Sequence, residues 1–412
     1  MELQNGQYCF QGSLNPLDLI ETYGSPLYVY DAARITSQYN RLVSAFSVPD
    51  LRIHYACKAL TNINILRLLR QLGAGLDTVS IQEVWIGLKS GFAPNDILYT
   101  PNCVSMEEIN MAVEAGVRIN IDNISILEQF GHLHPDYPVC LRINPHINAG
   151  GNSKISVGHI DSKFGISIHQ LPHLIKVVET LGIRIEGIHM HTGSDILDSD
   201  VFLRGAEILF QAALHFPDLD YIDFGSGFKV AYYENGVETD IEELGRNLGA
   251  RFQAFCKEYG RDLGLMFEPG KFLVSDAGVF FARVNVVKTT PSTVFAGLDS
   301  GLNHLIRPMF YEAYHEIENV TNPGGKPRIY TVVGYICETD TFGVNRKIPE
   351  IREGDILAMR NAGAYCFSMA SNYNSRFRPA EVLIHDGKDY LIRERETLED
   401  LLKKQIEIPI FA

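Results

Sequence analysis

Lys58 follows a strand-like run, Ile53-His54-Tyr55-Ala56-Cys57, that leaves no obvious place for an unpaired ammonium. A buried lysine usually avoids the cost of its charge through a lowered pKa or a covalent partner. Such a lysine is a good imine-forming nucleophile, the role it has in Schiff-base chemistry. The alternative is a lysine at a strand end whose ammonium reaches solvent.

Other apolar runs also end in polar groups. These run ends carry Asp77, Asn102, Asp122, Arg142, His189, His191, Gly225-Ser226-Gly227 and Glu268. In a barrel of parallel strands, residues at the carboxyl ends of the strands gather at one mouth, where such folds place their chemistry. The repeated polar endings therefore favour one site at that mouth.

Three of these run ends suit pyridoxal 5'-phosphate (PLP). Gly225-Ser226-Gly227 lets backbone N–H groups approach a phosphate closely. Glu268 can keep a pyridine nitrogen protonated, so that the ring accepts electrons. His191 can stack on the ring, with Ser194 near the phosphate. Taken singly, these residues also fit a tight turn, a surface carboxylate and a core histidine.

Two clusters later in the chain add groups that suit a substrate. Cys337 and Glu338 adjoin in a short loop between expected strands. A thiol can deliver a proton to a carbanion, and a carboxylate can hold an ammonium. Arg307, with Tyr311 after it, offers a two-point clamp for a carboxylate, although a surface ion pair is the alternative. The segment Asn361–Tyr365 is dense in hydrogen-bonding groups.

Apolar runs alternate with helical patterns from about residue 30 to 275. The runs are 53–59, 75–80, 96–102, 118–123, 139–144, 185–193, 221–227 and 265–270. Segments between them, such as 63–72 and 81–90, have apolar residues at helical spacing. Eight strand-plus-helix units predict an α/β fold, a (β/α)8 TIM-type barrel over residues 28–276. A doubly wound open sheet is the alternative, but no G-x-G-x-x-G motif follows the first run.

The pattern becomes all-β after about residue 276. Short runs at 279–287, 328–333, 355–359 and 381–384 are separated by turns such as 322–325 and 385–387. The segments 8–10 and 27–30 can add strands to this region. We therefore expect a second, all-β C-terminal domain, a sandwich or barrel, formed by residues 1–27 and 277–412.

Composition indicates a globular protein of two domains. The chain has 412 residues, of which 46% are hydrophobic and 21% charged, and no apolar stretch long enough for a membrane span. We expect no export signal and a cytoplasmic location. The net charge of −14 argues against nucleic-acid or membrane binding. Seven cysteines without a C-x-x-C pair indicate reduced thiols and no metal site, with all but Cys337 in the core.

Together these residues resemble the fold-type III PLP-dependent decarboxylases over about residues 25 to 395. The resemblance rests on Tyr55–Ala59, Gly165, His189–Ser194, Glu268–Gly270, Leu305–Tyr311, Cys337-Glu338 and Gly363–Asn374. Several of these motifs are weak alone, but their combination and order are specific. Within the family, the chain looks like the branch that converts meso-2,6-diaminopimelate to L-lysine and CO2, the last step of lysine biosynthesis.

The resemblance implies a role for each residue. Lys58 bonds the cofactor, His191 stacks on its ring and Glu268 pairs with the ring nitrogen. The implied cofactor ligands are Lys58, Asp77, His191, Ser194, Gly225, Ser226, Gly227, Glu268, Pro269, Gly270, Lys271 and Tyr365. The implied substrate ligands are Lys271, Arg307, Tyr311, Glu338 and Tyr365. Cys337 is the implied proton donor, and it reaches the partner's barrel site across a homodimer interface.

Two positions depart from the family pattern. The family's glycine triplet is Gly225-Ser226-Gly227 here, and its usual arginine after Glu-Pro-Gly is Lys271. The serine is compatible if its φ is negative, since the backbone does the binding. Lysine keeps a positive charge but loses the planar fork of arginine.

Related chemistries remain as alternatives. A decarboxylase of ornithine, arginine or carboxynorspermidine would share the fold, but ornithine has no second carboxylate for Arg307 to bind. A PLP racemase needs a two-base arrangement that we do not find. A catalytically inactive regulatory homologue is disfavoured because Lys58, Glu268 and Cys337 are all present.

Overall fold

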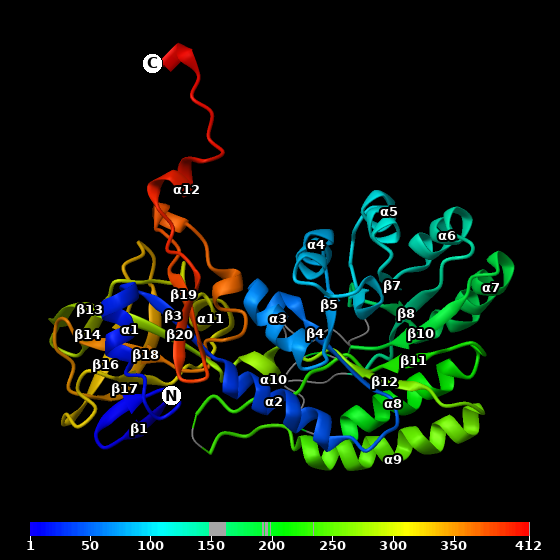
Figure 1. Cartoon of the computed structure of the whole chain (residues 1–412), viewed down its shortest axis with the longest axis horizontal. Helices are drawn as coiled ribbons and strands as arrows, with labels where there is room; N and C mark the ends of the chain where they lie inside the picture. Colours follow the sequence, from blue (N-terminus) through cyan, green and yellow to red (C-terminus); the bar gives the residue numbers. More distant parts are fainter. Residues whose placement is uncertain (148–161, 192, 194–196, 198, 234, 412) are drawn as a thin grey trace. The chain divides into compact units, whose positions relative to one another are not determined.

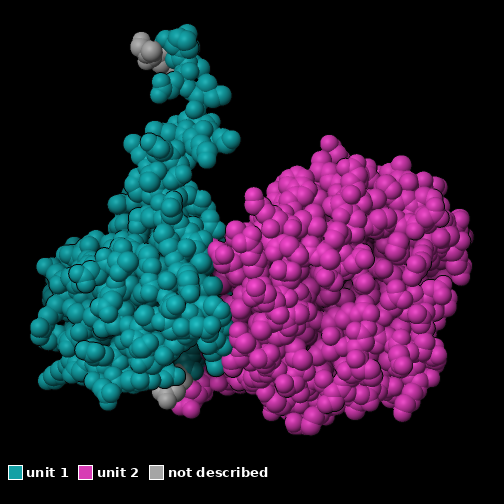
Figure 2. Space-filling model, viewed as in Figure 1, with its two compact units in different colours: residues 1–34, 232–234, 274–412 teal, residues 35–231, 235–273 magenta. Residues whose placement is uncertain are grey.

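The chain forms two compact units, coloured separately in Figure 2. The computed structural model describes residues 1–147, 162–191, 193, 197, 199–233 and 235–411. Residues 35–231 and 235–273 form the barrel unit, and residues 1–34, 232–234 and 274–412 form the β unit. Each unit has sheets of its own.

Eight parallel strands close into a ring in the barrel unit. They are β4 (Leu51–Ala56), β5 (Gly75–Thr78), β6 (Ile97–Tyr99), β7 (Arg118–Ile121), β8 (Val139–Asn144), β10 (Ile185–His189), β11 (Tyr221–Asp223) and β12 (Gly264–Phe267). Neighbours in the chain pair in order, β12 pairs with β4, and β8 pairs with β10. The (β/α)8 expectation is confirmed, and the alternative of an open doubly wound sheet is wrong.

Helices cover the outside of this ring (Figure 1). They are α2 (Ala32–Ala45), α3 (Ile63–Gln71), α4 (Ile81–Lys89), α5 (Met106–Ala115), α6 (Ile124–Leu133), α7 (Leu171–Leu181), α8 (Ser199–Ala213) and α9 (Ile241–Tyr259). Each presents an apolar stripe inward, as α3 does with Ile65, Leu66 and Leu69. Among the described residues, no helix has both the length and the apolar character needed to cross a membrane.

Side chains inside the barrel form layers, because every second residue of a strand points inward. One buried apolar cluster takes a residue from each of four strands: Leu98, Cys140, Tyr221 and Met266. Two residues further along the same four strands stand the polar groups Thr100, Arg142, Asp223 and Glu268. The polar run endings therefore lie one layer beyond the apolar core, at the carboxyl mouth.

The β unit is built on a sheet with the order β17-β16-β14-β13-β3-β19-β20, to which β18 and β15 are added beside β13. Its strands are β3 (Leu27–Asp31), β13 (Gly278–Thr289), β14 (Val294–Leu298), β15 (Ile317–Asn319), β16 (Pro327–Val333), β17 (Thr341–Pro349), β18 (Ile356–Met359), β19 (Ala380–His385) and β20 (Lys388–Arg393). Its helices are short: α1 (Pro16–Tyr23), α11 (Arg307–Tyr311) and α12 (Leu398–Leu402). The expected second, β-rich domain is present.

The N-terminal strands are only partly as expected. β3 lies between β13 and β19, so residues 27–30 join the main sheet. In contrast, β2 (Gln7–Cys9) pairs with β1 (Glu2–Gln4) in a separate two-stranded sheet. Phe10 still packs into the apolar cluster of the β unit with Val29.

Two details of the sequence reading are wrong. Several strands end earlier than predicted: the run 185–193 is a strand only to His189. Cys103 is exposed and Cys9 half-buried, so not all six cysteines lie in the core. Cys103 sits in the loop after β6 with φ of 58°.

Candidate active site

Lys58 lies just beyond the carboxyl end of β4, in the 3₁₀ turn Cys57–Ala59. Its Nζ is 3.5 Å from Oδ2 of Asp77 on β5, and its side chain is 43% exposed. Of the two interpretations, a lysine at a strand end whose ammonium reaches solvent matches the structure, because the turn carries Lys58 out of the strand and to the mouth. The amine is accessible to a ligand and has a carboxyl group beside it.

Asp77 is fully buried at the end of β5. Burial, with repulsion from Glu268, raises the pKa of Asp77 to about 7, although Lys58 acts in the opposite direction. Its Oδ1 has no hydrogen-bond partner among the described residues. Asp77 can therefore hold or release a proton near neutral pH beside the amine of Lys58.

Glu268 follows β12 and faces His189 across the mouth. Nε2 of His189 lies 3.3 Å from Oε2 of Glu268, and the amide nitrogen of Asn120 lies 2.8 Å from Nδ1 of the same ring. Burial alone would raise the pKa of Glu268, but the nearby Nε2 of His189 and attraction to the ammonium of Lys58 hold that pKa well below its ordinary range. Burial lowers the pKa of His189. The result is an anionic carboxylate facing a neutral imidazole.

Asp223, at the end of β11, stands beside this pair. Burial and repulsion from Glu268 raise the pKa of Asp223 well above its ordinary value. One ligand atom from each of His189, Asp223 and Glu268 lies within 4.8 Å of the others, a spacing that would also suit a metal ion. A protonated ring nitrogen would find the same acceptors in this trio.

The loop Gly225–Gly227 follows β11 in a conformation that needs its glycines. Gly225 has φ of 60° and Gly227 of 126°, whereas Ser226 is not among the positive-φ residues of the described chain. A Cβ on Gly225 would come within 2.7 Å of both Nδ1 of His191 and the carbonyl oxygen of Met190. The negative φ of Ser226 meets the condition set for a serine in the triplet.

His191 is tied to this loop, since the backbone N–H of Ser226 donates to its Nδ1 at 3.2 Å. Burial, with repulsion from Arg142 and Lys58, lowers the pKa of His191 well below its ordinary value. The ring is therefore neutral, and its flat face can stack on a flat ligand. Ser194, the other candidate in this segment, lies outside the described residues.

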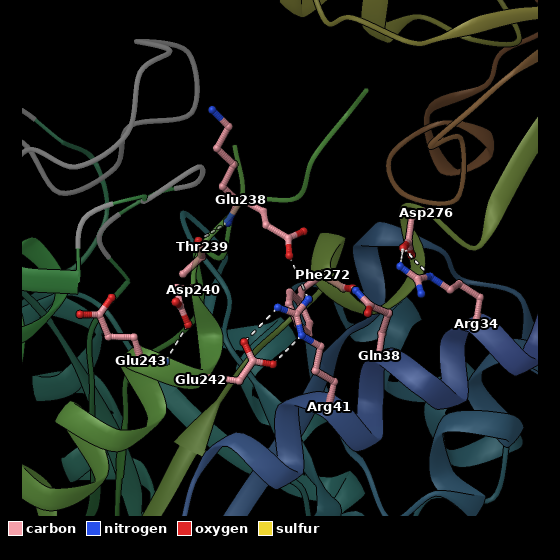
Figure 3. A network of polar contacts seen from close by, with 11 residues as sticks. Arg34, Gln38, Arg41, Glu238, Thr239, Asp240, Glu242, Glu243, Phe272 and Asp276 are labelled. Carbon is pink, nitrogen blue, oxygen red and sulfur yellow. Dashed lines mark hydrogen bonds and ion pairs between the residues drawn. The ribbon is translucent and has the colours of Figure 1, made fainter. Parts of the chain in front are cut away.

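Figure 3 shows how α2 anchors the chain that follows the glycine loop. Arg41 donates to both carboxylate oxygens of Glu242 in the first turn of α9, at 2.7 and 3.0 Å, and to Glu238 at 3.1 Å. Beside them, the backbone N–H of Thr239 donates to the carbonyl of Lys229 at 3.1 Å, and the N–H of Lys229 donates back to Oγ1 at 2.8 Å. These bonds hold both ends of the loop between β11 and α9.

The segment after Glu268 is held at both ends. The N–H of Ala56 donates to the carbonyl of Pro269 at 3.1 Å, which ties it to β4 beside Lys58. Gln38 of α2 donates to the carbonyl of Phe272 at 3.1 Å. Between them, Gly270 precedes the short helix α10 (Lys271–Val274), whose first residue, Lys271, is buried.

The other candidate residues lie in the β unit. Arg307 begins α11 and is buried; its Nη2 donates to the hydroxyl of Tyr232 at 2.9 Å. Its guanidinium carbon is 5.6 Å from the centre of the Tyr311 ring and 5.8 Å from that of Tyr232. Two aromatic rings thus fix a buried guanidinium, which suits a carboxylate ligand.

Cys337 and Glu338 are both exposed, in the loop between β16 and β17. The amide of Asn374 donates to Sγ of Cys337 at 3.2 Å, and the hydroxyl of Tyr373 donates to Glu338. Tyr365 is half-buried in the loop after β18, with φ of 57°, a value uncommon for a residue with a side chain. The structure therefore brings the thiol and the carboxylate together on one exposed loop.

Three residues that contribute to the geometry were missed from the sequence. Asn120 and Asp223 point into the barrel beside His189 and Glu268, and Tyr232 binds Arg307. Asp223 could have been found, since it ends an apolar run two residues before Gly225. Neither Asn120, in mid-strand, nor Tyr232, in a loop, carries a comparable sequence signal.

The barrel mouth has the donor set that PLP needs. It offers an accessible amine at Lys58, an anionic carboxylate at Glu268 and a glycine loop with no room for a Cβ at Gly225. Oε1 of Glu268 is buried without a hydrogen-bond partner among the described residues, and so is Oδ1 of Asp77. Buried polar atoms of this kind are what a polar ligand satisfies. The residues present fit PLP.

Comparisons with known proteins agree with this assignment. Residues 32–275 match the family described as pyridoxal-dependent decarboxylase, pyridoxal binding domain. The chain is 40% identical to the diaminopimelate decarboxylase of Methanothermobacter thermautotrophicus, covering 98% of this chain and 97% of that one. It is 34% identical to the diaminopimelate decarboxylase of Escherichia coli K12, covering 95% and 96%.

Comparison with solved structures also matches the chain to diaminopimelate decarboxylases. The diaminopimelate decarboxylase of M. jannaschii, solved in complex with L-lysine, superposes with a TM-score of 0.92 at 32% identity, covering 100% of this chain and 98% of that one. The match extends over both the barrel unit and the β unit. The chain belongs to the pyridoxal-dependent decarboxylase family and, within it, groups with the diaminopimelate decarboxylases.

Proposed function

We propose that this chain is a PLP-dependent carboxy-lyase that decarboxylates meso-2,6-diaminopimelate to L-lysine and CO2, the last step of lysine biosynthesis. The observation that carries the proposal is the barrel mouth, where the accessible amine of Lys58, the anionic Glu268 and the loop at Gly225 occur together in a chain of this family.

In the proposed site, the amine of Lys58 holds the cofactor, and the cofactor supplies a ring that accepts the electrons of the breaking bond. Glu268 pairs with the ring nitrogen, and the neutral ring of His191 lies against the cofactor's face. The phosphate of the cofactor is bound at Gly225, Ser226, Gly227 and Tyr365. The remaining contacts come from Asp77, Ser194, Pro269, Gly270 and Lys271.

Two groups move protons in this proposal. Asp77, with a pKa of about 7 and 3.5 Å from Nζ of Lys58, exchanges a proton with that amine. Cys337 delivers a proton from Sγ to the carbon that has lost its carboxylate. The hydrogen bond from the amide of Asn374 to Sγ of Cys337 supports this role, because it orients the sulfur.

Substrate binding is assigned to Lys271, Arg307, Tyr311, Glu338 and Tyr365. Arg307, fixed by its contacts to Tyr311 and Tyr232, binds the carboxylate that does not react. Glu338 holds the ammonium at the same end of the substrate, and Lys271 and Tyr365 complete the contacts. A substrate without a second carboxylate leaves Arg307 with nothing to bind, which disfavours ornithine.

We further propose a cytoplasmic homodimer with shared sites. Residues 28–276 are the proposed PLP-binding domain, and residues 1–27 with 277–412 are the proposed β domain, which contributes to the active site and to the dimer interface. Cys337 and Glu338 would reach the partner's barrel from their exposed loop. A two-fold interface makes that exchange reciprocal.

The test is a product assay on purified protein with added PLP. We expect equal amounts of CO2 and L-lysine from meso-diaminopimelate, and at least about a hundredfold lower kcat/KM for lysine and ornithine. Arg307→Lys should lower kcat/KM for diaminopimelate by about thirty- to a thousandfold while PLP binding is retained. A preference for ornithine, or an unaffected Arg307→Lys enzyme, would show that the substrate assignment is wrong.

A further inference from the structure

A second polar cavity lies at the opposite end of the barrel from Lys58. It has a volume of about 510 Å³ and is lined by residues 51–54 of β4, by the first residues of β5 and β7, and by the loops that lead into β5 and β6. This volume falls within the range of about 300–1,000 Å³ typical of small-molecule sites. The mouth assigned to PLP uses none of the residues that line it.

The charges lining this cavity oppose the charge of the whole protein. Arg52, Arg70 and Arg118 line it, against a single acidic residue, Asp96, in a chain of net charge −14. Arg52 is partly neutralised by Asp50, to which its Nη2 donates at 2.6 Å. Three guanidinium groups around one cavity in an acidic protein indicate a ligand with concentrated negative charge.

Two of these arginines share a ring. The guanidinium carbons of Arg52 and Arg118 lie 5.7 and 5.3 Å from the centre of the Tyr221 ring, inside the barrel. Like charges held against one ring repel each other, and an anion between them removes that cost. Arg52 and Arg118 are half-buried, so solvent screens their repulsion only in part.

Buried donors in the cavity wall also lack partners. Nη1 of Arg118 and Nδ1 of His54 are buried and have no hydrogen-bond partner among the described residues. His54 is only 6% exposed and lines the cavity from β4. A guanidinium has donors and no acceptor, and a neutral imidazole can turn an N–H toward an acceptor. Nη1 of Arg118 therefore needs an acceptor, and Nδ1 of His54 needs a partner, that the described chain does not supply.

Two glycines leave space for the side chains of His54 and Arg70. A Cβ at Gly75 would come within 2.6 Å of the His54 ring, and one at Gly91 within 3.4 Å of the guanidinium carbon of Arg70. Both glycines line the cavity. The absence of side chains at these positions leaves His54 and Arg70 at the cavity wall.

We propose that this cavity is a second anion site, which binds a phosphate group through Arg52, Arg70, Arg118 and His54. Phosphate matches the donor set because it accepts from several guanidinium groups at once, each through two parallel bonds. The phosphate is either inorganic or that of a small monoester, and the two sources are separable by titration. The site is independent of the cofactor's phosphate, which the carboxyl mouth would bind.

The test is calorimetric titration of the holoenzyme, freed of unbound PLP, with inorganic phosphate at constant ionic strength. We expect saturable binding of one phosphate per chain beyond that of the cofactor. Arg70→Gln and Arg118→Met should each weaken it by at least about tenfold. Arg70 is exposed, so its variant keeps the test valid if Arg118→Met fails to fold. Competition by glycerol 3-phosphate would extend the site to monoesters.

The matched control is Arg67→Gln, which removes the same charge from α3 one turn earlier, outside the cavity lining. It should bind phosphate like the wild type. Absence of saturable binding, an unaffected Arg70→Gln, or an equal loss in Arg67→Gln would each overturn the proposal. The last result would mean a general attraction of phosphate to surface charge.

Discussion

Nε2 of His189 faces Oε2 of Glu268 at 3.3 Å, while Nδ1 of the same ring faces the amide nitrogen of Asn120 at 2.8 Å. The amide donates to Nδ1, so the neutral ring carries its proton on Nε2, on the side of Glu268. That proton stabilises the carboxylate, consistent with the depressed pKa of Glu268. His189 is therefore a positioning residue that keeps Glu268 anionic for a cationic ring nitrogen.

Glu268→Gln should leave the fold and PLP binding intact but slow decarboxylation by at least about a hundredfold. A neutral amide cannot keep the pyridine nitrogen protonated. Steady-state kinetics and the cofactor's absorbance separate the two effects. Glu186→Gln, at another buried barrel glutamate, is the matched control and should keep its kcat. An unchanged kcat in Glu268→Gln would mean that this carboxylate only supports the structure.

Gly225→Ala should weaken PLP binding by at least about tenfold, because the new Cβ would meet Nδ1 of His191 and the carbonyl of Met190 at 2.7 Å. Gly182→Ala is the control: its φ of 64° is close to the 60° of Gly225, and nothing lies within 4 Å of its Cβ. Both variants carry a backbone strain of about 1 kcal/mol. PLP titration of the apoenzymes should separate them; equal affinities would remove the glycine loop from the phosphate site.

The stability of the β unit should fall between pH 6.5 and 4 because of His304. This ring is buried between the hydroxyl of Ser300 and the carbonyl of Phe377, both at 3.0 Å, and burial lowers its pKa from 6.5 to about 4. The folded pKa lies below the unfolded one, so stability is complete above pH 6.5 and is lost as the unfolded chain takes up the proton.

Urea unfolding at pH 7 and pH 5 measures this contribution. His304→Gln should reduce the loss of stability between these pH values by about 2 kcal/mol. His385→Gln, at the exposed end of β19, should keep the loss seen in the wild type. Identical pH dependence in His304→Gln and wild type would contradict a buried, neutral His304.

Lys58→Ala and Cys337→Ala should complement each other if the sites are shared across a homodimer. Each variant alone should be nearly inactive. After refolding together, about half of the dimers should be mixed, and one site of each mixed dimer should carry neither change, which restores about a quarter of the wild-type activity. If both residues act in the same chain, mass spectrometry will show mixed dimers but no activity will return.

The sequence predicts the fold well because its signals are local. Eight apolar runs with helical segments between them specify the barrel, and polar residues at the run ends mark the mouth. The exposure of Lys58 could not be read in this way, since it depends on a 3₁₀ turn that ends β4 at Ala56. The position of Asn120 beside His189 depends on the register between strands, which no local pattern reveals.

The most direct test of the account is where the cofactor attaches. Borohydride reduction of the holoenzyme, followed by digestion and mass spectrometry, should find one pyridoxyl group per chain, on the peptide that contains Lys58. Lys58→Ala should lose both this label and nearly all turnover. A label on another lysine, such as Lys271 at the same mouth, would contradict the site described here.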